Sequence, residues 1–287
     1  MAVNKTIFLL STALLAVLSH YAVADTLRTV VVNPNQTIKV EYPQGYAVGE
    51  HEHINVNNQD DEHLYFNAPM TPDLYRLELQ NDQGTKHTIQ VAVKVPFTAT
   101  SKKIEGYEIG SYPSPYKGLE QYQAPDGFIR VMQSDLDTYI TKNVQIKQLL
   151  CKQTSGYPKF LYVNDDGLTM LEDLLQFLKG EGVNVTRFAF ISAYRTPFYN
   201  RSIGNGRHSR HQYGDAFDLY IDENGNKRMD DLNGDGKEDA RDVDTLYALF
   251  EKFHKQSRYI GGIGRYYPKS HHGGFVHIDN RGFKARW

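Results

Sequence analysis

The spacing of apolar residues changes along the chain, and this change predicts two folded parts. In the first part apolar and polar residues alternate over 76–80 and again over 89–95, and the turn-forming residues 81–84 separate the two runs. Alternation with a period of two is typical of strands, and two such runs joined by a turn predict a β-hairpin. We therefore expect a β-rich, β-sandwich-like domain over residues 25–98.

The second part mixes helical and strand patterns. Four leucines between residues 171 and 178 recur at helical spacing, and the run stops at Gly180. A second amphipathic pattern predicts a helix over 243–254. Short apolar runs predict strands at 188–191, 217–221 and 275–278. We expect an α+β domain over 145–287, and a length of 287 residues suits two domains better than one.

The segment 99–144 lies between these two parts. Its first portion, up to about Asp126, is rich in Gly, Pro, Ser and Tyr. Such a composition predicts a linker or an extended segment docked on a domain.

Charge and cysteine content exclude several classes of protein. The chain has 32 Lys and Arg against 34 Asp and Glu, a net charge of -2, so it offers no bulk positive field for nucleic acid. Cys151 is the single cysteine. It excludes an internal disulfide and any site that needs several cysteines.

The first 24 residues have the pattern of a secretory signal peptide. Lys5 precedes an apolar run over 7–18, and Ala22-Val23-Ala24 forms a small-residue cleavage site before Asp25. The alternative is an uncleaved membrane anchor, for which the apolar run is short. We expect a cleaved signal peptide over 1–24, a periplasmic or secreted protein, and no membrane span in the mature chain.

The most informative segment for function is 209–219, Ser-Arg-His-Gln-Tyr-Gly-Asp-Ala-Phe-Asp-Leu. Apolar residues flank Asp218, so a strand that buries them would turn the carboxylate to the opposite face. A second histidine, His277, lies on a later apolar run. Together with His211 these residues could hold Zn²⁺ through three ligands and leave one position for water, which zinc makes nucleophilic. The spacing alone also fits a polar turn and an ordinary strand histidine.

These motifs together resemble the zinc peptidases of the LAS group, which includes lysostaphin-type endopeptidases, D-alanyl-D-alanine carboxypeptidases and the zinc domain of sonic hedgehog. The pattern Ser-x-His-x-x-Gly-x-Ala-x-Asp over 209–218 and the later Val-His-Ile-Asp over 276–279 carry the likeness. Ser-Ala-Tyr-Arg over 192–195 makes it closest to the D-alanyl-D-alanine carboxypeptidases. The resemblance covers about residues 105–287.

The resemblance implies a zinc-dependent D,D-peptidase, either carboxypeptidase or endopeptidase, that hydrolyses peptidoglycan stem peptides. His211, Asp218 and His277 would bind one catalytic zinc ion. Arg195 would hold the terminal carboxylate of the substrate, since a guanidinium can bind it bidentately. By weaker analogy, Tyr194 and Ser209 would line the substrate pocket.

One departure from the family concerns the general base. Family members usually place a carboxylate or a histidine shortly before the last ligand, where this chain has Gly274 and Phe275. The nearby candidates are His272, which we favour, His271 and Asp279; Asp279 could instead support His277 from behind. Weak or absent catalysis would make the chain a zinc domain that binds cell-wall peptides without cutting them.

An acidic segment over 222–244 interrupts the zinc domain and contains an EF-hand-like loop. Gly236 occupies the sixth loop position, where the chain turns sharply, and the twelfth position has Asp in place of the usual Glu. The candidate ligands are Asp231, Asn233, Asp235, Lys237 (where that pattern uses a carbonyl), Asp239 and Asp242. We expect a structural Ca²⁺ ion there; a solvated acidic loop is the alternative, and a calcium-stabilised adhesion protein without zinc is a third possible function.

A histidine pair in the first domain offers a weaker metal pattern. His51 and His53 flank Glu52, but polar loop residues often have this appearance. We give this pair little weight.

Overall fold

The computed structural model describes residues 26–49, 51, 53–270 and 272–287. The expected signal peptide over 1–24 lies outside the described residues, as do Glu52 and His271. In the described part, no helix has the length and apolar character needed to cross a membrane.

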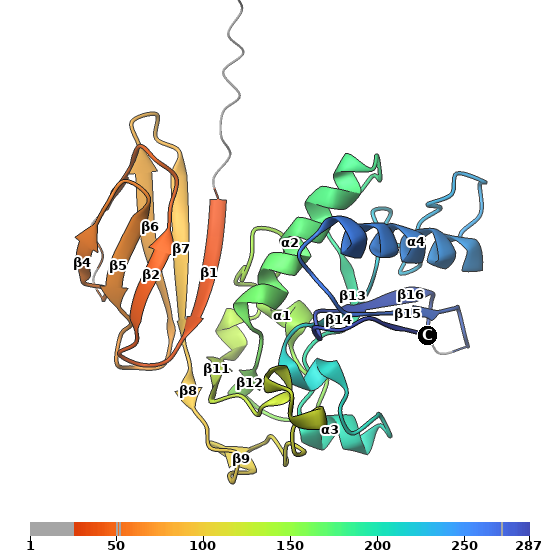
Figure 1. Cartoon of the computed structure of the whole chain (residues 1–287), viewed down its shortest axis with the longest axis horizontal. Coiled ribbons are helices and arrows are strands. Elements are labelled where there is room, and N and C mark those ends of the chain that lie inside the picture. The colour runs from red at the N-terminus through yellow and green to blue at the C-terminus, as the bar shows by residue number, and fades with distance from the viewer. Residues whose placement is uncertain (1–25, 50, 52, 271) are drawn as a thin grey trace, which may run out of the picture.

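In the described part of residues 26–93, seven strands form the first domain (Figure 1). Their bounds are β1 (Thr26–Val32), β2 (Thr37–Glu41), β3 (Tyr46–Val48), β4 (Val56–Gln59), β5 (His63–Asn67), β6 (Leu74–Asn81) and β7 (Lys86–Val93). One sheet has the order β1-β7-β6-β3 and the other β2-β5-β4. The apolar residues of both sheets, such as Phe66 and Leu77, form one buried cluster. The hairpin predicted from the alternating pattern is confirmed, since β6 pairs antiparallel with β7.

The second domain contains a five-stranded sheet of order β13-β14-β16-β15-β17 and four helices. The strands are β13 (Ala189–Ser192), β14 (Ala216–Tyr220), β15 (Gly262–Tyr266), β16 (Phe275–Asp279) and β17 (Ala285–Arg286). The helices are α1 (Ile146–Leu149), α2 (Asp165–Gly180), α3 (Pro197–Ser202) and α4 (Ala240–Gln256). The helices predicted around 171–178 and 243–254 are therefore confirmed as α2 and α4.

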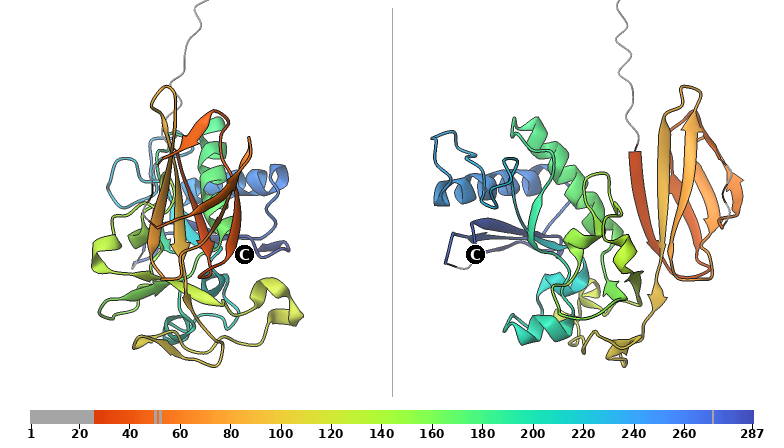
Figure 2. Two further views of the ribbon diagram at one scale, coloured as in Figure 1. Left: turned by 90° about the vertical axis from the view of Figure 1, so that its left-hand side faces the viewer. Right: turned by 180° about the vertical axis from the view of Figure 1, so that it is seen from behind.

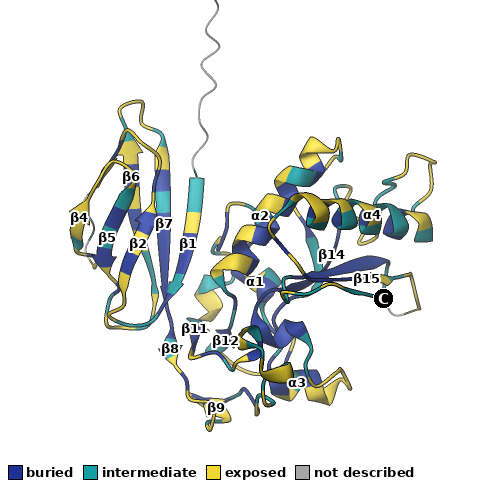
Figure 3. Cartoon of the chain, viewed as in Figure 1, coloured by how far each residue is buried: buried dark blue, intermediate teal, exposed yellow. Residues whose placement is uncertain are grey.

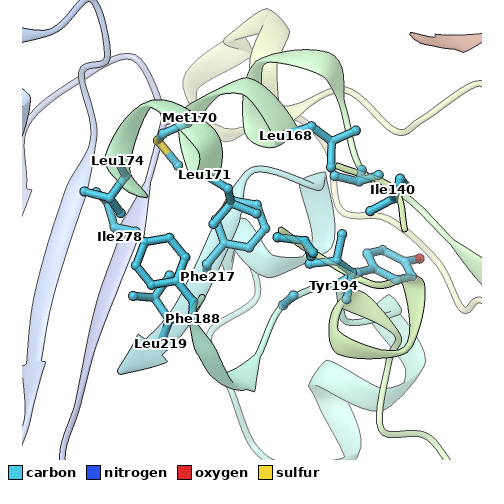
Figure 4. Close-up of a cluster of buried hydrophobic side chains, with 14 of the residues drawn as sticks. Ile140, Leu168, Met170, Leu171, Leu174, Phe188, Tyr194, Phe217, Leu219 and Ile278 are labelled. Atoms are coloured by element: carbon cyan, nitrogen blue, oxygen red, sulfur yellow. The ribbon is translucent and has the colours of Figure 1, made fainter. Parts of the chain in front are cut away.

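The two faces of this sheet differ in chemistry because side chains alternate along each strand. On one face Phe217, Leu219 and Ile278 pack against α2 in a continuous core that also includes residues of α4 (Figure 4). Asp218 and His277 are the next residues in register, so they point to the opposite face. The apolar core thereby fixes which side of the sheet can carry a polar site.

Local sequence explains where the two long helices begin. The Asn164 side chain accepts a hydrogen bond from the backbone of Gly167 at the start of α2. The Asp239 side chain caps α4 by accepting from the Arg241 backbone, and the Asp239 backbone N–H donates to the Asp242 carboxylate, which completes a capping box. Each cap satisfies backbone donors that a helix end leaves unpaired.

The segment 99–144 packs into the core of the second domain. Ile104, Ile109 and Phe128 are buried there among residues of the later helices and strands. Its short elements are β9 (Lys103–Ile104), β10 (Tyr107–Glu108), η1 (Tyr116–Gly118), η2 (Glu120–Tyr122), β11 (Gly127–Val131) and η3 (Gln133–Asp135). β11 pairs with β8 (Val95–Pro96) and with β12 (Lys159–Leu161). The segment thus adds buried structure instead of spanning open solvent.

The two domains contact each other along β1 (Figure 2). The backbone N–H of Val31 donates to the Asp165 carboxylate at 3.0 Å, at the start of α2. The Thr29 hydroxyl donates to the carbonyl of Ile140 and is buried. Burial colours show the exposed side of the first domain at β4, away from this contact (Figure 3). The first domain is therefore tied to the second by specific hydrogen bonds.

Candidate metal centre

Strand pairing brings the three expected zinc ligands together. Asp218 on β14 stands directly opposite His277 on β16. His211 comes from the short helix η4 (Arg210–Tyr213), and Gly214 at φ 76° turns the chain from η4 toward β14. All three side chains are buried, and one ligand atom from each lies within 4.8 Å of the others. This is the one such set of His, Cys, Asp or Glu among the described residues.

Hydrogen bonds behind the two imidazoles fix which nitrogen faces the centre. His211 donates from Nδ1 to the Ala193 carbonyl at 2.6 Å, and His277 donates from Nε2 to Asp279 Oδ2 at 2.8 Å. These bonds leave His211 Nε2 and His277 Nδ1 facing the centre, where a metal ion would bind them once His277 has released its second proton. These atoms lie 3.2 Å and 2.8 Å from the Asp218 oxygens. A tetrahedral zinc ion with bonds of about 2.0–2.1 Å would hold its ligand atoms roughly 3.3 Å apart, so the set fits zinc.

Electrostatics at the centre favour a cation. Burial opposes ionisation of Asp218, but His211 and His277 outweigh it and hold the pKa of Asp218 well below its usual range. Burial alone would lower the pKa of His277, yet its hydrogen bonds to Asp218 and Asp279 raise it to about 9. Burial lowers the pKa of His211. The site keeps an ionised carboxylate in the interior, and His277 and Arg195 are its positive partners among the described residues.

Arg195 contacts this centre through its side chain. Its Nη2 donates to Asp218 Oδ2 at 2.6 Å, and its Nε donates to the hydroxyl of Ser192 at 2.8 Å. The side chain is 12% exposed and lines the same cavity as the three ligands. Among the described residues, no acceptor takes a hydrogen bond from Nη1. The Nε and Nη2 edge of the guanidinium is thus held by Ser192 and Asp218, and the Nη1 donors are available to a ligand in the cavity.

The two described candidates for the general base, Asp279 and His272, differ in their access to the cavity. Asp279 is fully buried, does not line the cavity, and accepts hydrogen bonds from His277, Arg281 and the Gly262 backbone. These bonds suit Asp279 to positioning His277 and not to taking a proton from water in the cavity. His272 does line the cavity, where its Nδ1 lies 2.7 Å from the Gly273 carbonyl.

Of the two residues expected to line the substrate pocket, Ser209 and Tyr194, only the first does so. Ser209 lines the cavity. Tyr194 does not: it is 3% exposed, and its hydroxyl lies 3.4 Å from that of Tyr112 in the core. Burial raises the pKa of Tyr194 well above its usual value. The expectation that Tyr194 contacts substrate is therefore wrong, because the chain leaves β13 after Ser192 and turns this ring inward.

The cavity above the three ligands has a volume of about 890 Å³. Two of its aromatic walls, Tyr266 and Trp287, were not identified from the sequence. Lys152 and Lys269 stand at its rim and are exposed. The alternation in Gly262–Tyr266 could have placed Tyr266 on the same face as the ligands, but Trp287 gives no such signal.

The acidic loop directs its carboxylates to its own backbone. Asp231 accepts hydrogen bonds from the N–H groups of Gly234, Asp235 and Gly236. Asp242 is fully buried and accepts from the backbone of Leu232 and Asp239. These contacts fold the loop tightly.

The remaining loop candidates contact neighbours within the loop. Arg241 forms ion pairs with Asp235 and Asp239. The Asn233 side chain accepts from the Asp235 backbone, and the Lys237 backbone donates to Asp235. The loop carboxylates do not converge as a metal set among the described residues.

His51 and His53 in the first domain do not form a metal set either. His51 Nδ1 lies 2.6 Å from the Gly49 carbonyl, and the His53 ring packs edge-on against Tyr75.

Comparison with known proteins gives one match. Residues 188–233 match the family model of Peptidase M15, a stretch that contains β13, His211 and Asp218. No curated protein and no solved structure matches the chain. The matched segment supports an M15 zinc peptidase, a metallopeptidase that hydrolyses peptide bonds.

Proposed function

We propose that this protein is a zinc D,D-peptidase that hydrolyses peptidoglycan stem peptides outside the cytoplasm. The observation that carries the proposal is the convergence of His211, Asp218 and His277 at an open cavity, with the outer nitrogen of each imidazole held by a hydrogen bond. The family match over 188–233 supports the metallopeptidase class. The D,D-peptide specificity is our inference from the surrounding residues.

His211, Asp218 and His277 would hold the metal, and neighbouring groups would orient the two histidines. Zinc in such a site lowers the pKa of bound water and polarises a carbonyl. Asp279 orients His277, and the Ala193 carbonyl orients His211. The helix η4 and strands β14 and β16 are rigid elements, so the cavity is organised before substrate arrives.

His272 is the proton acceptor that we propose. It is the one described candidate base that lines the cavity, on the loop that leads into β16. Histidine is the side chain that most often serves as a general acid or base in catalysis. His272→Ala should lower kcat roughly a hundredfold or more without releasing zinc.

Arg195 is the residue that we propose for binding the terminal carboxylate of a carboxypeptidase substrate. Arg195→Lys keeps the charge and loses the planar fork. We expect a loss of roughly 1.5–3 kcal/mol in transition-state stabilisation, measured as kcat/KM. Because Arg195 also contacts Asp218, zinc content must be measured in parallel. An endopeptidase, whose substrate has no free carboxylate there, would lose much less.

A second candidate function is a zinc domain that binds cell-wall peptides without cutting them. Gly274 and Phe275, at the positions where the family usually has its base, favour it. Incubating the zinc-loaded protein with muropeptides and measuring product masses decides between the two. Loss of D-alanine or cleavage of a cross-link supports the peptidase; binding with unchanged masses supports the passive domain.

We also propose a structural Ca²⁺ ion in the loop that begins at Asp231. The motif over 231–242 supports it, and the tight turn at Gly236 has the positive φ of 81° that the pattern requires. In the observed loop the backbone and Arg241 occupy the carboxylates. Calcium would have to displace these contacts in part.

A further inference from the structure

Tyr266 lies on the face of the sheet that carries the zinc ligands. Gly264 on β15 pairs with His277 on β16, and Tyr266 pairs with Phe275. Paired residues, and residues two apart on one strand, lie on the same face of a sheet. The Tyr266 side chain therefore points to the same face as His277, and Gly264 leaves that face open beside it. Tyr266 also lines the cavity that contains the three ligands.

The absence of a side chain at Gly264 lets an indole lie over the strand. A Cβ at Gly264 would come within 2.3 Å of Trp287 Nε1. Trp287 thereby reaches the space beside His277, with ring centroids 5.1 Å apart. Its backbone is held by pairing with β15, where Arg265 donates to the Trp287 carbonyl at 3.0 Å. The indole therefore forms part of the cavity wall, in contact with His277 and Tyr266, and 45% of Trp287 remains exposed.

The hydrogen bond between the two aromatic residues has a defined direction. An indole N–H can only donate, so Trp287 Nε1 donates to the Tyr266 hydroxyl oxygen at 2.8 Å. The tyrosine ring also stacks on Phe275 at 4.5 Å and 7°. Among the described residues, no acceptor takes the Tyr266 O–H proton. The phenol is fixed at its ring and its oxygen, while its own proton is available to a ligand in the cavity.

We propose that Tyr266 is a catalytic residue that donates its O–H to the oxygen of the scissile amide as that oxygen gains negative charge. This inference rests on the proposed peptidase function. The proton stays on the phenol throughout, so the step is a hydrogen bond and not a transfer. Trp287 is a positioning residue, because its N–H fixes the direction in which the Tyr266 proton points. Donors aimed at developing charge act most strongly in the transition state.

The test compares four variants of the zinc-loaded protein. Tyr266→Phe removes the donor, Trp287→Phe removes the orienting N–H, and Gly264→Ala displaces the indole. The matched control is Tyr267→Phe, since Tyr267 is 42% exposed and donates to Asp244 at 2.8 Å outside the cavity. Each variant is assayed for zinc content, for kcat and KM on a D-Ala-D-Ala peptide, and for affinity toward a phosphinate dipeptide whose tetrahedral, anionic centre mimics the transition state.

We expect Tyr266→Phe to lower kcat about 100- to 1,000-fold with little change in KM and in zinc content. It should weaken the phosphinate by a similar factor and leave D-alanine binding unchanged. Trp287→Phe and Gly264→Ala should cause smaller losses of the same kind, and Tyr267→Phe should cause none. Retention of kcat within about threefold by zinc-loaded Tyr266→Phe overturns the assignment.

The two proposals fail in different ways. If the wild-type protein cleaves no peptide, the peptidase function fails, and phosphinate binding then decides the role of Tyr266. Equal phosphinate affinity of wild type and Tyr266→Phe overturns that role. Loss of zinc in Tyr266→Phe also overturns it, since the residue would then act on the metal site and not on the substrate.

Discussion

The protein contains two segments with the residue types of a metal site, and they differ in how far their ligands are assembled. In the His211, Asp218 and His277 set, the ligand atoms converge within 4.8 Å. In the acidic loop, Asp231 caps three backbone N–H groups and Arg241 pairs with Asp235 and Asp239. One site is organised by a sheet and the other by its own turn.

The difference shows what organises a ligand set before the metal arrives. Strand register places Asp218 opposite His277, and an apolar core on the reverse face prevents either strand from rotating. The acidic loop is exposed over 233–237, and its carboxylates bind the nearest donors. A preorganised site loses less conformational entropy on binding and should hold its ion more tightly.

The largest expected effect is loss of zinc on removing a ligand. His277→Ala leaves two protein ligands, and we expect bound zinc to fall below roughly a tenth of an equivalent at micromolar zinc. Metal analysis of chelator-washed, zinc-refilled protein measures it. His208→Ala is the control, because His208 lines the same cavity without being a ligand. One full equivalent of zinc in His277→Ala would show that His277 is not a ligand, and the contrast between the two sites would then fail.

A smaller loss is expected when the support behind a ligand is weakened. Asp279→Asn keeps the shape and removes the charge that accepts from His277 Nε2. Zinc affinity should fall about 10- to 100-fold, the usual effect of losing such a partner. Competition with a coloured chelator measures it, and melting of the zinc-free variant checks that the fold persists. An affinity within twofold of wild type contradicts the idea that preorganisation distinguishes this site.

Calcium should stabilise the acidic loop by a few degrees. An ion at a hundred times its Kd adds about 2.7 kcal/mol if it binds only the folded state. For a chain of this size that corresponds to a rise in Tm of several degrees, absent in Asp231→Ala. Melting curves in chelator and in millimolar calcium provide the measurement. Identical curves would show that the loop is a solvated acidic turn.

The smallest expected effect comes from Arg241, the arginine that pairs with two carboxylates of the acidic loop. The Arg241 side chain is 56% exposed, so solvent screens its ion pairs and they add little to stability. Arg241→Gln should change calcium-free stability only slightly and raise calcium affinity, because the arginine no longer competes with the ion for Asp235 and Asp239. Calorimetric titration measures the affinity, with Arg258→Gln as an exposed control. Weaker calcium binding in Arg241→Gln would show that the arginine does not compete.

The sequence identified residues whose position follows from alternation or from a motif. His211, Asp218 and His277 were identified in this way. The helix α2 follows from leucine spacing, and α4 follows from the amphipathic spacing of Leu246, Leu249, Phe250 and Phe253. Alternation could not place Tyr194, since it applies only while a strand continues and β13 ends at Ser192.

Other features depend on contacts between distant parts of the chain. Trp287 reaches His277 only because β17 pairs with β15 and Gly264 has no side chain. The same holds for Arg195, whose partner Asp218 is 23 residues away. A single sequence contains the residues of such contacts but not their proximity.

The pairing of Asp218 with His277 also determines when the centre can form. The two residues are 59 positions apart, and α4 and the acidic loop lie between them. The complete ligand set does not exist until β16 has entered the sheet between β14 and β15. A zinc ion at these ligands would therefore bind after β16 has joined the sheet, and it would link two residues 59 positions apart. In the chain-entropy model, such a cross-link opposes unfolding by about 4 kcal/mol. The apolar core on the reverse face of the sheet does not include the three ligands, so we expect the chain to fold without zinc and to bind it afterwards.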